Sequence, residues 1–158
     1  MEVSEESRMG VNQDFRDLFR IFNEENVEYI IVGAHAVIFY AEPRYTKDID
    51  VWINPSPDNA KRVMNALEKF GAPLDDVSIN DFTDPDLIYQ IGVEPNRIDI
   101  MMGIAGVTFE QAYCNSEQAT YGDVPVHILG RQELLTSKKT TARLQDLIDI
   151  ENLEDADS

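Results

Sequence analysis

The chain has 158 residues, of which 43% are hydrophobic, enough for one domain with a core of its own. Its 13 Lys and Arg residues against 30 Asp and Glu residues give a formal net charge of −17, which argues against general binding to long DNA or RNA. A single cysteine, Cys114, excludes an internal disulfide, and no apolar run approaches the roughly 20 residues that cross a bilayer, so we expect a cytoplasmic protein without a membrane partner. Residues 1–10 form a polar tail by composition, 11–153 a single domain and 154–158 an acidic tail.

Local patterns in the first half of the chain predict two long helices, a short helical segment and two strands. Residues 12–26 form an amphipathic helix behind an Asn12 N-cap, because apolar side chains recur at i, i+3, i+4 and i+7, namely Phe15, Leu18, Phe19 and Phe22. The apolar run 28–33 ends at a glycine and predicts a buried strand, followed by one or two helical turns over 34–40. The alternation in residues 48–54 predicts a second strand, and the second long helix begins at Ser56-Pro57 and ends at Gly71.

The second half is rich in strands and ends in helices. Residues 87–93 and 97–102 flank a short turn and predict a hairpin, and Thr108 begins a short helix. A strand pair brackets Gly122-Asp123, and the proline in its second member, Pro125, predicts an edge strand. Residues 131–153 are helical, in two pieces. This order predicts an α+β domain in which helices flank a mixed sheet.

Three aspartates lie within the predicted strands. Asp48 and Asp50 occupy alternate strand positions, so their side chains point to one face with Cα atoms about 6–7 Å apart. Arg97 and Asp99 repeat this arrangement on a later strand. If the two strands are neighbours, Asp99 completes a cluster of three carboxylates that a divalent cation can neutralise. The alternative is the solvated face of a half-exposed sheet, although aspartate is depleted in strands.

Motifs around these aspartates resemble a known superfamily. Residues 32–37 (VGAHAV), 43–50 (PRYTKDID) and 98–100 (IDI) are similar, in that order, to the polymerase-beta-type nucleotidyltransferases. Within that superfamily the chain resembles the small prokaryotic AbiEii and minimal nucleotidyltransferase (MNT) proteins, over about residues 29–153. The resemblance implies a polymerase-beta-like nucleotidyltransferase fold.

The resemblance also implies roles for residues. Asp48, Asp50 and Asp99 would hold two Mg²⁺ ions, with Mn²⁺ as an alternative, and Asp99 would lie nearest the attacking hydroxyl. Gly33 would form a turn against the nucleotide phosphates. The superfamily usually has Gly-Gly or Gly-Ser where this chain has Gly33-Ala34, and Ala34 keeps the backbone N–H but lacks a hydroxyl.

Several other polar residues are candidates for nucleotide binding, each with a structural alternative. Arg44, Thr46 and Lys47 precede the acid pair and are expected near triphosphate oxygens or as counter-charges in a loop. His35 is expected at a phosphate or ribose; the alternative is a capping or core histidine. Lys139 and Arg143 belong to a late basic stretch that, by the resemblance, reaches the nucleotide; the alternative is a series of surface salt bridges.

Three functions remain open from the sequence. The first is transfer of a nucleoside monophosphate from an NTP to a hydroxyl on protein, RNA or a small molecule. The second is a catalytically weak or inactive partner protein of antitoxin type, completed by a helical partner protein; Ala34 and the short chain motivate it. The third is a metal-dependent phosphohydrolase that uses the same acids.

Overall fold

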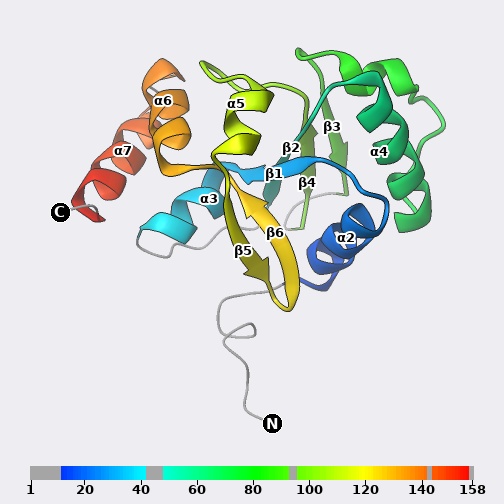
Figure 1. The fold of residues 1–158 in the computed structure, drawn as a ribbon, viewed down its shortest axis with the longest axis horizontal. Helices are drawn as coiled ribbons and strands as arrows, with labels where there is room; N and C mark the ends of the chain where they lie inside the picture. The colour runs from blue at the N-terminus through cyan, green and yellow to red at the C-terminus, as the bar shows by residue number, and fades with distance from the viewer. Residues whose placement is uncertain (1–11, 42–47, 93–95, 142–143, 157–158) are drawn as a thin grey trace, which may run out of the picture.

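A computed structural model describes residues 12–41, 48–92, 96–141 and 144–156. Within these ranges a six-stranded mixed sheet has the order β3-β4-β2-β1-β6-β5 and is flanked by helices, as predicted (Figure 1). The strands are β1 (Tyr29–Val32), β2 (Ile49–Ile53), β3 (Ile88–Ile91), β4 (Ile98–Met101), β5 (Glu117–Tyr121) and β6 (Val124–Ile128). The helices are α2 (Gln13–Glu24), α3 (Gly33–Tyr40), α4 (Pro57–Phe70), α5 (Phe109–Cys114), α6 (Arg131–Thr141) and α7 (Leu144–Ala156), with a 3₁₀ helix, η1 (Ile79–Thr83).

The long helices begin and end where their capping residues predict. The Asn12 side chain accepts hydrogen bonds from the backbone N–H groups of Asp14 and Phe15, and α2 buries its predicted apolar stripe. Ser56 caps α4, and Gly71 ends that helix in the left-handed conformation, with φ +93°. The helices α2 and α4 pack together, whereas α3, α6 and α7 form a second group (Figure 1).

The centre of the sheet combines antiparallel and parallel pairs. β1 pairs antiparallel with β2, and β2 pairs parallel with β4, which in turn forms the predicted antiparallel hairpin with β3. Beyond Asp50, β2 is buried on both faces, through Val51, Trp52 and Ile53. The parallel β2–β4 pair is the feature that positions the site described below.

The prediction that the strand containing Pro125 lies at an edge is wrong. β6 lies between β1 and β5, and β5 is the edge strand. The proline is tolerated because the pairing of β6 with β1 joins Ile128 to Ile31, beyond Pro125 along the strand.

The last helix is longer than predicted: α7 continues to Ala156, past residue 153. No helix in the described ranges is long and apolar enough to span a membrane.

Candidate active site

The sheet brings two of the predicted aspartates side by side. In the parallel pair of β2 and β4, Asp50 lies opposite Asp99, so the two predicted strands are indeed neighbours. Asp48 immediately precedes β2, and its Oδ1 accepts a hydrogen bond of 3.1 Å from the backbone N–H of Arg97. The three acids therefore lie at the same end of the parallel strands β2 and β4.

The surroundings of Asp50 disfavour its charged form. Burial raises the pKa of Asp50 to about 6, and the neighbouring charges of Asp99 and Asp48 raise it as well. Arg97 opposes this effect. A cluster of crowded, partly buried carboxylates is typical of a site that takes up positive charge.

Arg97 supplies positive charge to the cluster in this structure. Its Nε donates to Asp99 Oδ1 at 2.8 Å and its Nη2 to Asp99 Oδ2 at 3.1 Å, and Nη2 also lies 3.3 Å from Asp48 Oδ2. The sequence placed Arg97 on the same strand face as Asp99 without assigning it a role. The signal was the spacing: an arginine two residues before a strand aspartate lies on the same side of the sheet.

The donor set fits a hard divalent cation, because it consists of carboxylate oxygens that repel one another. Among the described residues, however, no three His, Cys, Asp or Glu side chains are arranged to hold one ion in this conformation. Coordination of Mg²⁺ by Asp48, Asp50 and Asp99 together therefore stays a prediction.

The backbone of Gly33 lies directly against the side chain of Asp50. It follows β1 directly with φ +67°, and a Cβ at this position would lie 2.1 Å from Asp50 Oδ2. Gly33 and Ala34 begin α3, whose N-cap residue, Val32, makes no side-chain cap hydrogen bond. The first backbone N–H groups of this helix thus have no side-chain cap and suit an anion, although phosphate binding here remains a prediction.

A cavity of about 580 Å³ extends from Gly33 and Asp50 toward the last two helices. Its apolar side chains are Val32, Ile88, Met101, Ile104, Ala105, Leu129 and Leu134. The polar side chains at its far side are Ser137, Lys138, Thr141 and Asp146. A second hollow, of about 650 Å³, lies at β5 and β6 and has no carboxylate in its lining, so the smaller cavity is the one associated with the acid cluster.

Lys138, rather than the predicted Lys139, reaches this cavity. The Lys138 ammonium pairs with Asp146 at 3.3 Å and with Asp149 at 3.0 Å, and both aspartates are buried. Lys139 is 57% exposed and lies 3.8 Å from Glu154. The spacing alone could not have separated the two lysines, since Leu134 and Leu135, four residues before Lys138 and Lys139 respectively, are both buried.

The remaining predicted site residues lie apart from the acids or outside the described residues. The His35 ring packs edge-on against Phe15 and also contacts Tyr121, and burial lowers its pKa to about 4. Arg44, Thr46, Lys47 and Arg143 lie outside the described residues.

Solved structures share the fold. The lincosamide antibiotic adenylyltransferase LnuA, in a lincomycin-bound crystal structure, matches with a TM-score of 0.59 and 16% identity over 92% of this chain and 98% of its own. The antibiotic-resistance factor ANT(2'')-Ia, in a solution structure, matches with a TM-score of 0.61 and 13% identity over 97% and 84%. TM1012 from Thermotoga maritima, assigned provisionally as a nucleotidyltransferase, matches with a TM-score of 0.54 and 11% identity over 89% and 88%. The chain therefore has a nucleotidyltransferase fold. No family model and no curated protein matches the sequence.

Proposed function

We propose that this protein is a metal-dependent nucleotidyltransferase that moves a nucleoside monophosphate from an NTP to a hydroxyl acceptor. The observation that carries the proposal is the pairing of Asp50 with Asp99 on adjacent parallel strands, with the Gly33 turn against Asp50. Nucleotidyl transfer needs chiefly positioning and charge neutralisation, and this site concentrates both requirements. The shared fold supports the same reaction class.

Each part of the site has a role in the proposal. Asp48, Asp50 and Asp99 hold Mg²⁺ or Mn²⁺, which when bound neutralises the phosphates and activates the attacking hydroxyl. Asp99 accepts the proton of that hydroxyl. The backbone N–H groups of Gly33 and Ala34 bind phosphate oxygens at the start of α3.

The cavity beside Asp50 is proposed to hold the body of a substrate. Its volume of about 580 Å³ falls in the range of small-ligand sites, about 300–1,000 Å³. At its far side the Lys138 ammonium pairs with Asp146 and Asp149, so its positive charge is balanced within the protein and this side of the cavity is polar. Two of the similar structures are antibiotic-resistance or antibiotic-modifying proteins by name, so a small hydroxylated molecule is a reasonable acceptor to test first. The more specific resemblance of the sequence motifs to AbiEii and MNT proteins is the reason to test protein and RNA as acceptors as well.

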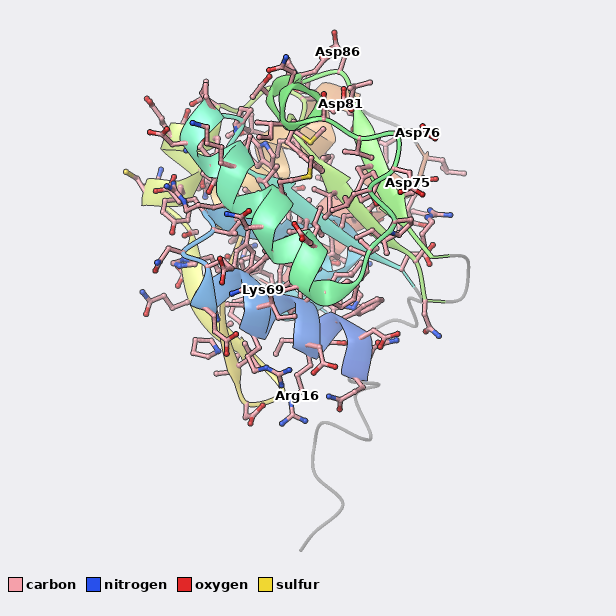
Figure 2. The ribbon with its side chains drawn as sticks, turned by 90° about the vertical axis from the view of Figure 1, so that its right-hand side faces the viewer. Arg16, Lys69, Asp75, Asp76, Asp81 and Asp86 are labelled. Atoms are coloured by element: carbon pink, nitrogen blue, oxygen red, sulfur yellow. The ribbon has the colours of Figure 1, made fainter. Side chains whose placement is uncertain are left out.

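The experiment measures transfer of label from each α-³²P-NTP, with Mg²⁺, to a panel of acceptors that includes lincomycin, RNA and protein. We expect labelled acceptor with release of pyrophosphate, and a loss of about 10²-fold or more in Asp50→Asn and Asp99→Asn. The matched control is Asp76→Asn, because Asp76 is exposed on the loop after α4 (Figure 2). Absence of both label transfer and NTP binding would contradict the proposal, and release of phosphate instead of pyrophosphate would favour a phosphohydrolase.

A second candidate is a non-catalytic partner protein of antitoxin type. The observation that favours it is the apolar surface of α7, where Leu144, Leu147 and Ile148 are 76%, 54% and 44% exposed. Stable co-purification with the all-helical product of an adjacent gene, combined with no turnover by either the chain or the complex, would support this candidate over the enzyme.

A further inference from the structure

Arg97 uses the same carboxylate oxygens that the proposed metal site requires. Both oxygens of Asp99 accept hydrogen bonds from the guanidinium, at 2.8 and 3.1 Å, and Asp48 Oδ2 lies 3.3 Å from Nη2. The side chains of Arg97, Asp48 and Asp99 are only 28%, 23% and 12% exposed, so water screens these pairs weakly. This is a fork-like, charge-assisted interaction, which is stronger than a hydrogen bond between neutral groups.

A divalent cation and this guanidinium exclude each other at Asp99. An ion that binds an Asp99 oxygen in the plane of the carboxylate occupies the direction from which Arg97 now donates. The two positive groups also repel each other at such short range, and more strongly in partly buried surroundings than in water.

We propose that Arg97 is a built-in competitor of the metal: its side chain holds Asp48 and Asp99 together in the metal-free protein and leaves them when the metal binds. The inference rests on the metal site of the proposed function. Arg97 is thus a positioning residue, which keeps the acid cluster assembled without metal and sets the metal affinity. A lysine cannot replace it fully, because an ammonium lacks the two parallel donors of the guanidinium.

The test compares Mn²⁺ binding, followed by the electron paramagnetic resonance of free Mn²⁺, in the wild type, Arg97→Met and Arg97→Lys. We expect Arg97→Met to bind Mn²⁺ about tenfold more tightly, because the acids no longer have to be released from a competing partner, and Arg97→Lys to lie between the two. In EDTA, Arg97→Met should melt at a lower temperature than the wild type and recover more on adding Mn²⁺. Arg20→Met removes the same charge from half-exposed α2, where Arg20 pairs with Asp17, and should bind Mn²⁺ as the wild type does.

A measurement on the wild type covers the case in which Arg97→Met does not fold. The ¹⁵N-¹H resonance of Arg97 Nε, assigned by its loss in Arg97→Lys, should move on titration with Mg²⁺ as its bond to Asp99 breaks. Unchanged or weaker Mn²⁺ binding in both Arg97 variants, or an Nε resonance that stays in place while Mg²⁺ binds, would overturn the inference and leave the metal site standing. Absence of Mn²⁺ binding in every variant and the wild type would overturn both.

Discussion

Two titratable side chains near the start of α3 show how burial sets charge at single residues. Burial raises the pKa of Asp50 to about 6 and lowers that of His35 to about 4, so in both cases the neutral form is favoured. Their surroundings differ in one respect. Asp50 lies beside the charged side chains of Asp48, Asp99 and Arg97, where a bound cation can balance the negative charge. His35 instead packs against the rings of Phe15 and Tyr121. His35 is therefore a partly buried residue that packs among aromatic rings, and we expect its effect to be on stability.

Replacing His35 by Phe should remove part of the acid sensitivity of the fold. Above about pH 6.5, His35 is neutral in both the folded and the unfolded chain, so it contributes no pH dependence there. As the pH falls from about 6.5 to about 4, the unfolded chain binds a proton that the folded chain does not, and the wild type loses up to roughly 3 kcal/mol relative to His35→Phe. Urea unfolding of both chains from about pH 7 to about pH 4.5 measures the difference. A difference independent of pH would contradict this reading of His35.

At the scale of elements, the junction from β1 to α3 is shaped by its contact with β2. Gly33 takes a positive φ, and its missing side chain leaves room for the carboxylate of Asp50 on the adjacent strand. Two constraints thus coincide at one residue: a backbone conformation that L side chains rarely adopt and close approach of a side chain across the sheet. Gly71 at the end of α4 has the first constraint without the second, since no heavy atom lies within 4 Å of the position of a Cβ.

The pair of variants Gly33→Ala and Gly71→Ala separates these two constraints. Both pay the cost of the left-handed backbone, about 1–2 kcal/mol. Gly33→Ala should cost more, because its Cβ would meet Asp50 Oδ2 at 2.1 Å and force that carboxylate to move. Free energies of unfolding from urea titration, together with Mn²⁺ binding, measure both effects: we expect weakened metal binding in Gly33→Ala alone. Equal destabilisation and equal metal binding in the two variants would show that the contact with Asp50 has no consequence.

The charge of the whole molecule opposes its own folding. With a formal net charge of −17, acidic side chains repel one another over the surface, and ion pairs such as Arg16–Asp123 compensate only part of this. Figure 2 shows Asp75, Asp76, Asp81 and Asp86 on the loop after α4 and around η1. Of these, Asp81 accepts a hydrogen bond from the backbone N–H of Ser78 at 3.0 Å and so also stabilises η1. The other three contribute mainly charge.

Salt should therefore stabilise this protein. Raising NaCl from about 20 mM to about 500 mM shortens the screening length from roughly 20 Å to roughly 4 Å, and we expect the melting temperature to rise by several degrees. The triple variant Asp75→Asn, Asp76→Asn, Asp86→Asn should melt higher than the wild type at low salt and respond less to NaCl. Differential scanning calorimetry checks both. A melting temperature that stays constant or falls with NaCl would show that surface repulsion is not a significant term.

The sequence by itself determined the features that depend on near neighbours along the chain. The caps and apolar stripes of α2 and α4 and the placement of Asp48 and Asp50 around one strand all follow from spacings of a few residues, and the structure confirms these elements. Only the tertiary structure decided which strand lies beside which. The pairing of β2 with β4 puts Asp99 beside Asp50 and Arg97 among the acids, and the pairing of β6 with both β1 and β5 makes β5 the edge. The packing of α6 against α7 likewise turns Lys138, not Lys139, toward the buried aspartates and the cavity. These contacts join segments far apart in the chain, and no local period encodes which distant partner will bury a given face.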